Sequence, residues 1–233
     1  MFIVTEQTPN PEAMKFIPHC VLTSGPAQDF RRLDHQPGRS PLADRLFELP
    51  AVEGVFIAHD FVTVRRAPGG PPWSVLRLQA ITALADHIAG GAPALNGPAP
   101  IEAISGGEIE DEILGVLGLY VRPGVARDGG DVVFDRFDPV TGVLWIEMRG
   151  ACGGCPSSQL TLKATIENIV RRYVPEVTRV EATAAAAEGG APSRLQAWMT
   201  KLKGARSQGP RPVFTHNGKP MSPDQPSPAN HQT

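Results

Sequence analysis

Two stretches rich in glycine and proline divide this chain and limit how it can fold. The chain holds 24 Gly and 24 Pro among 233 residues, well above the usual combined share of roughly 12%. The excess lies in residues 90–100 (GGAPALNGPAP) and in residues 189–233. Such composition is typical of linkers and tails, because it offers no continuous apolar face. We therefore expect two small domains and a tail in place of one large core.

The boundaries of these segments follow the changes in composition. We predict an N-terminal domain over residues 1–90, a linker over 91–104, a second domain over 105–183 and a tail over 184–233. The tail ends in Pro, Asn, Gln and Ser and is poor in apolar residues, so we expect it to be disordered.

The first domain is predicted to be α+β, with helices covering one face of a small sheet. Apolar runs typical of strands lie at residues 2–6, 14–17, 55–58 and 61–64. Two helices are expected to begin at serine caps, Ser40 before Pro41 and then Ser74. The second of these helices would carry Leu78, Ile81, Ala85 and Ile88 along one side.

The second domain is predicted to be another small α/β sandwich-like unit, in the order helix, strand, strand, helix, strand. A capping box at 105–108 begins its first helix, and Pro123 is expected to end it. Strands are predicted over residues 132–137, 143–149 and 177–182. The second helix begins at Pro156 and is expected to bury Leu162, Ile166, Ile169 and Tyr173.

A pair of cysteines carries the chemistry of the second domain. The chain has 3 Cys, and two of them form Cys152-Gly-Gly-Cys155 between a strand and the helix that begins at Pro156. In a reducing compartment this spacing indicates metal or redox chemistry. The positive end of the helix dipole lowers the pKa of a nearby thiol, so we expect thiolates here. The two glycines let both sulfur atoms point to one side.

The number of available ligands predicts a shared site. Iron–sulfur clusters and structural zinc sites usually take about four protein ligands, and this segment offers Cys152 and Cys155. Cys20 lies in the other predicted domain, and none of the 6 His lies within residues 105–183. Two chains related by a twofold axis would supply four thiolates. We therefore expect metal loading to produce a homodimer.

Two alternatives stay open from the residues alone. A strand, a CxxC pair and a helix also suit a thiol-disulfide oxidoreductase, although a β-hairpin before Cys152 does not match the βαβ unit of thioredoxin. A zinc-binding interaction module is the other alternative. The sequence carries no phosphate loop of the GxxxxGK kind, no nucleophile elbow and no HExxH motif, so we do not expect an enzyme.

Charge and hydropathy restrict the partners and the compartment. A net charge of -2 and a pI near 6.3 give no electrostatic footprint for nucleic acid. No apolar run approaches the roughly 18 residues of a membrane span. The N-terminal residues resemble neither a secretory signal nor an Arg-rich transit peptide, so we predict a cytoplasmic protein without a nucleic-acid or membrane partner.

The residues around the cysteine pair resemble the C-terminal domain of NifU, which is found in Nfu-type iron–sulfur proteins. The likeness lies in residues 121–131 (VRPGVARDGGD), 150–158 (GACGGCPSS), 162–163 (LK), 166–167 (IE) and 174–177 (VPEV). The first domain is similar to the N-terminal domain of the same proteins, in residues 8–11 (TPNP), 14–16 (MKF), 40–43 (SPLA), 55–56 (VF) and 60–63 (DFVT). The resemblance covers about residues 1–182.

This resemblance implies a carrier or scaffold that holds a [4Fe-4S] cluster, or alternatively a [2Fe-2S] cluster, through Cys152 and Cys155 in a homodimer. It also implies an upstream cluster-assembly scaffold as donor and apo iron–sulfur proteins as acceptors. The N-terminal domain would contact acceptors without supplying a ligand, and Cys20 matches no motif of the family. The basic tail after residue 188 departs from the family pattern, and its role stays open.

Overall fold

A computed structural model of the chain describes residues 2–97, 107–153 and 156–183. All of these residues belong to one compact unit. The tail predicted over 184–233 therefore lies outside the described residues, and the boundaries predicted at 90, 104 and 183 stay predictions.

In chain order the elements are β1 (Val4–Gln7), β2 (Ala13–Ile17), β3 (Gln28–Arg31), α1 (Pro41–Phe47), β4 (Val52–Ile57), β5 (Val62–Arg66), α2 (Trp73–Ala89), α3 (Glu108–Val116), the π-helical turn η1 (Leu117–Val121), α4 (Arg122–Arg127), β6 (Gly130–Asp138), β7 (Val143–Gly150), the 3₁₀ turn η2 (Ala151–Gly153), α5 (Pro156–Tyr173) and β8 (Arg179–Thr183).

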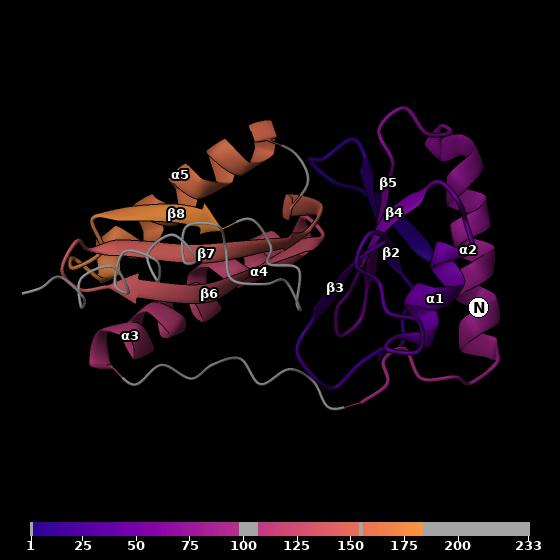
Figure 1. Cartoon of the computed structure of the whole chain (residues 1–233), viewed down its shortest axis with the longest axis horizontal. Coiled ribbons are helices and arrows are strands. Elements are labelled where there is room, and N and C mark those ends of the chain that lie inside the picture. The colour runs from indigo at the N-terminus through magenta and orange to yellow at the C-terminus, as the bar shows by residue number, and fades with distance from the viewer. Residues whose placement is uncertain (1, 98–106, 154–155, 184–233) are drawn as a thin grey trace, which may run out of the picture. The chain divides into compact units, whose positions relative to one another are not determined.

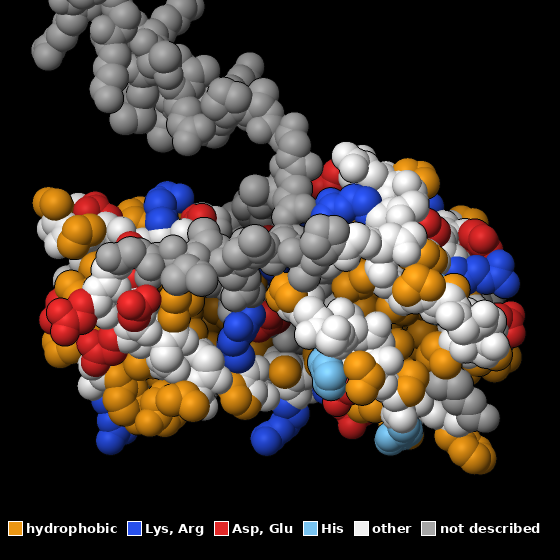
Figure 2. Space-filling view, turned by 90° about the horizontal axis from the view of Figure 1, so that it is seen from below, with side chains coloured by type: hydrophobic (Ala, Val, Ile, Leu, Met, Phe, Trp, Pro, Cys, Tyr) orange, Lys and Arg blue, Asp and Glu red, His pale blue; other side chains and the backbone are white. Residues whose placement is uncertain are grey.

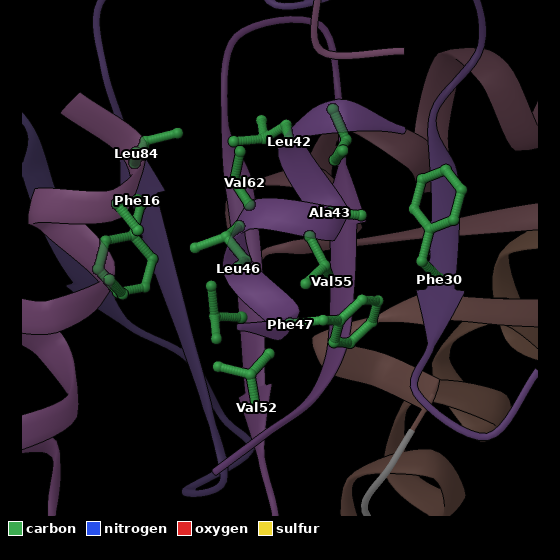
Figure 3. Packing of buried hydrophobic residues seen from close by; sticks show 14 of the residues in the cluster. Phe16, Phe30, Leu42, Ala43, Leu46, Phe47, Val52, Val55, Val62 and Leu84 are labelled. Atoms are coloured by element: carbon green, nitrogen blue, oxygen red, sulfur yellow. The ribbon is translucent and has the colours of Figure 1, made fainter. Parts of the chain in front are cut away.

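The first sheet has five antiparallel strands in the order β1-β2-β5-β4-β3, and α1 and α2 cover one of its faces (Figure 1). Alternate side chains of a strand point to opposite faces. Phe16 and Val62 therefore point toward the helices and pack with Leu46 of α1 and Leu84 of α2 in one buried cluster (Figure 3). This confirms the prediction of a small sheet covered by helices.

Of the two serine caps predicted in the first domain, one is confirmed. The Oγ of Ser40 accepts a hydrogen bond from the N–H of Ala43 at 3.0 Å and donates one to the carbonyl of Ala94 at 2.6 Å. Ser74 is not a cap, because α2 begins at Trp73 with Pro72 in the cap position.

The predicted packing side of α2 is wrong in part. Its buried residues are Leu76, Ala80, Ala83 and Leu84, while Leu78 is exposed. The packed stripe includes two alanines, which let the helix lie close to its neighbours. A count of large apolar residues gives such positions too little weight.

The sequence did not indicate β3. Its residues QDFR contain one apolar side chain, Phe30, which is buried. The strand pairs with β4 at the edge of the sheet, and pairing with a neighbour can form a strand that lacks an alternating apolar pattern.

The second sheet has three strands in the order β6-β7-β8, with β6 and β7 antiparallel and β7 and β8 parallel. Its core is separate from the first and contains Ile113 from α3, Leu144 and Ile146 from β7, and Ile166 from α5. The chain thus has two mixed domains of helices and strands, as predicted.

Pro123 does not end the first helix of the second domain, so that prediction is wrong. The helix passes through η1, and α4 then begins at Arg122 with Pro123 in its first turn. A first-turn residue needs no helical N–H partner, so proline fits there. Ser105 lies outside the described residues, and α3 begins at Glu108 with Gly107 as its cap.

The prediction that Tyr173 is buried is also wrong. It is 40% exposed, and its ring stacks on that of Tyr120 with 4.5 Å between the ring centroids. In α5 Ile166 is fully buried, whereas Leu162 and Ile169 pack against the core while partly buried.

Within the part of the chain that the structure describes, no helix is long and apolar enough to cross a membrane. Basic and acidic side chains are interspersed over the face that Figure 2 shows.

Candidate metal centre

The loop after β7 carries the first cysteine of the pair. At Gly150 the backbone adopts a φ of 67, a conformation that glycine reaches without strain. Ala151–Gly153 then form the turn η2, and α5 follows at Pro156. Cys152 is therefore held between β7 and α5, as predicted. Cys155 lies outside the described residues, and its partnership with Cys152 rests on their spacing.

Glycines make room for the Cys152 side chain. Gly130 of β6 pairs with Gly150 of β7. A Cβ at Gly130 would lie 2.6 Å from the Sγ of Cys152, and a Cβ at Gly153 would lie 2.8 Å from the carbonyl oxygen of Met148. The turn can therefore pack against the end of the hairpin only while these positions lack side chains.

Burial and two carboxylates determine the pKa of the Cys152 thiol. Cys152 is 7% exposed and belongs to the second core. Burial, and to a smaller extent the negative charges of Asp128 and Asp131, raise the pKa of Cys152 to about 12. The lowered thiol pKa expected from the helix dipole is therefore wrong for this cysteine. A metal that binds here must displace a proton from the sulfur.

Asp131 ties α4 to β6. Its Oδ1 accepts hydrogen bonds from the N–H of Val132 at 2.8 Å and from Nε of Arg122 at 2.9 Å. Its Oδ2 accepts a third from Nη2 of Arg122, also at 2.9 Å. The carboxylate thus fixes the residues that precede β6, beside the cysteine loop.

A cavity of about 700 Å³ has Cys152 in its wall. Its lining is largely apolar and includes Val121, Val125 and Ile166, together with the charged side chains of Arg127 and Asp128. Sequence reasoning missed this cavity, because its walls come from helices that are far apart along the chain. An apolar surround keeps water from a metal–sulfur group, which suits a soft thiolate ligand.

The described residues add no further ligand cluster. In residues 2–97, 107–153 and 156–183, no group of three or more His, Cys, Asp or Glu side chains lies in a position to hold a metal ion. Cys20 is a free, half-buried cysteine of the first domain. Cys152 supplies a soft thiol donor, which fits a metal–sulfur group.

Comparisons with known proteins agree with this arrangement of domains. The sequence model of the family "Scaffold protein Nfu/NifU N terminal" matches residues 3–91. The model of the "NifU-like domain" matches residues 113–181, a range that contains both cysteines of the pair.

Similar proteins cover most of the chain. "NFU1 iron-sulfur cluster scaffold homolog, mitochondrial" from Drosophila simulans is 37% identical over 90% of this chain and 75% of its own length. The protein of the same name from Homo sapiens is 36% identical over 78% of this chain and 71% of its own length. The solution structure of a NifU-like protein from Saccharomyces cerevisiae matches 42% of this chain and 87% of that one, with a TM-score of 0.38 and 24% identity. With two family domains in the expected order and relatives that match across both, the chain belongs to the Nfu-type family of NifU-like iron–sulfur cluster scaffold proteins.

Proposed function

We propose that this protein carries a [4Fe-4S] cluster on Cys152 and Cys155 and delivers it to apo iron–sulfur proteins without catalysing a reaction of its own. The observation that supports this most is the CxxC loop between β7 and α5, in a domain that matches the NifU-like family. Thiolates are the protein ligands that iron–sulfur clusters use. A [2Fe-2S] cluster is the alternative cargo.

The cluster would be shared between two chains. Two thiolates per chain give half of the usual four, and no described group of His, Cys, Asp or Glu supplies the rest. A twofold homodimer completes the set and makes the cluster part of the interface. With two bonds to each chain, such a cluster can leave by thiolate exchange, which suits receipt from an assembly scaffold and delivery to acceptors.

The protein reconstituted anaerobically with iron and sulfide tests this proposal. Mössbauer spectra would report the cluster type, and the mass in solution would report a dimer. Cys152→Ser and Cys155→Ser should each abolish the brown chromophore, because each dimer then loses two of four thiolates. Cys20→Ser should load normally and serves as the control. A loaded monomer without an added thiol, or a cluster retained in either ligand variant, would contradict the proposal.

The alternatives predict different results in the same preparation. Insulin reduction at the rate of a thioredoxin, without bound iron, would favour the oxidoreductase. The raised pKa of Cys152 weighs against it, because the thiolate is the attacking species. Tight zinc without acid-labile sulfide would favour the zinc module.

The compartment is a separate question from the cargo. The N-terminal residues predict the cytoplasm, whereas the relatives from Drosophila simulans and Homo sapiens are named mitochondrial. Those names give the cytoplasmic prediction no support. Cell fractionation with an antibody against the native protein distinguishes the two.

A further inference from the structure

The face of the first sheet that points away from α1 and α2 carries buried polar side chains beside the apolar cluster of Phe56, Ala58 and Phe61. On β5, Val62 and Val64 face the helix-covered core, so Thr63 and Arg65 face the opposite way. Lys15 is the neighbour of Thr63 across β2 and β5. Thr63 is 0% exposed, and Arg65 and Lys15 are each 8% exposed. Buried polar groups of this kind need hydrogen-bond partners.

Their partners are backbone carbonyls of the second domain. Thr63 Oγ1 donates to the carbonyl of Gly129 at 2.7 Å, and Lys15 Nζ donates to that of Ala126 at 3.1 Å. Arg65 Nη1 donates to the carbonyl of Gly150 at 2.9 Å. These acceptors lie in the residues that lead into β6 and at the end of β7, where the hairpin meets the cysteine loop.

A fourth contact reaches the residue next to Cys152. The Nδ2 of Asn10 donates to the carbonyl of Ala151 at 3.0 Å, in a buried hydrogen bond. The Oδ1 of Asn10 accepts from the N–H of Glu12 at 2.9 Å and so holds the amide in this orientation. The two carbonyls that immediately precede Cys152 are thus both bound by side chains of the first domain.

Arg65 is itself held in place. Its Nη1 also lies 3.3 Å from Oδ2 of Asp29, whose side chain is 6% exposed. A Cβ at Gly54 would lie 2.4 Å from Nη2 of Arg65, so the guanidinium passes where another residue would have its side chain. Burial raises the pKa of Asp29 and the charge of Arg65 opposes that rise, which ties the carboxylate to the guanidinium.

We infer that the helix-free face of the first sheet is an intramolecular docking surface for the cysteine loop, and that Asn10 and Arg65 are positioning residues that keep Cys152 buried. Loss of either contact leaves a buried carbonyl without its donor and favours opening of the loop. The importance of this opening for cluster release rests on the proposed function. The docking itself does not, since it is a property of the metal-free chain.

Asn10→Asp is the sharpest test. The carboxylate keeps the shape of the amide and the acceptor for Glu12, but it removes the donor and sets an oxygen against the carbonyl of Ala151. The control is Asn96→Asp, because the Nδ2 of Asn96 donates to the carbonyl of Gly38 at 3.0 Å, a contact that involves no residue of the second domain. Both variants add the same charge.

The rate of iodoacetamide reaction at Cys152 in the metal-free full chain, measured by peptide mass spectrometry relative to Cys20, is the readout. A buried thiol reacts through local opening, so its rate follows the opening equilibrium. We expect Asn10→Asp to raise the ratio about tenfold, the factor that about 1.4 kcal/mol produces. Asn96→Asp should leave it unchanged. Global unfolding would raise the Cys20 rate as well, and a thermal melt detects it.

Arg65→Lys provides a second, independent variant. Lysine keeps the charge but lacks the planar fork that reaches both Asp29 and the Gly150 carbonyl. Its control is Arg66→Lys, since Arg66 bonds Glu12 and the carbonyl of Pro71, both in the first domain. Wild-type ratios in both Asn10→Asp and Arg65→Lys, or equal increases in the controls, would overturn the docking inference. Failure to bind iron would instead contradict the proposed function and leave this readout intact.

Discussion

Single residues decide whether the cysteine loop can pack against the hairpin. We expect Gly130→Ala to lower the free energy of unfolding by about 1–3 kcal/mol, the usual cost of forcing atoms into a packed site. The added methyl group would lie 2.6 Å from the Sγ of Cys152 and 2.7 Å from the carbonyl oxygen of Arg149. Urea unfolding measures the loss, and iron content after reconstitution should fall with it.

Gly115→Ala is the matched control. Gly115 lies on α3, and a Cβ there has no neighbouring atom within 4 Å. Alanine exceeds glycine in helix propensity by up to about 1 kcal/mol, so this variant should be as stable as the wild type or more so. Equal destabilisation of both variants would show that the contact with Cys152 does not matter.

The thiol of Cys152 shows what residue-level reasoning from sequence can and cannot reach. The CxxC spacing and its place between a strand and a helix could be predicted, because both depend on local patterns. The raised pKa could not, because it arises from burial and from Asp128 and Asp131. These groups come together only when α4, β6 and α5 pack, and the helix dipole alone predicts the opposite direction.

Among the elements, α1 and α2 begin in different ways, and this difference can be measured. Ser40→Ala should reduce the free energy of unfolding by about 1–2 kcal/mol, because the cap of α1 and the bond to the Ala94 carbonyl are both lost. Ser74→Ala should change it little, since Ser74 is exposed inside α2. Thermal or urea unfolding compares the two. A larger loss for Ser74→Ala would restore the sequence-based assignment of that cap.

Elements with a strong local sequence pattern could be predicted, whereas elements that form through pairing or packing with neighbouring elements could not. The hairpin strands β4, β5, β6 and β7 contain apolar runs typical of strands, and the cap at Ser40 is a local motif. The edge strand β3 depends on pairing with β4. The helix continues past Pro123 because the π turn η1 places this proline in the first turn of α4. Amino-acid composition does not predict such a turn.

At the scale of the whole molecule, the two separate cores predict that the second domain binds the cluster and the first domain contacts acceptors. A chain that begins at residue 101 should still bind iron and sulfide, because the second core consists of second-domain residues and Cys152 and Cys155 both lie in that domain. It should transfer its cluster more slowly to some acceptors, because the predicted acceptor contacts are gone. Iron content and transfer assays against the full chain test both statements. A truncated chain that cannot bind iron would mean that the domains share the site.

The passage of Arg65 over Gly54 also has an evolutionary consequence. A side chain at position 54 and a long cation at position 65 compete for the same space, so the two sites are expected to covary among homologues. Lineages that keep the arginine should keep the glycine. A lineage with a larger residue at position 54 should have a shorter side chain at position 65, and its two domains should be joined through other contacts.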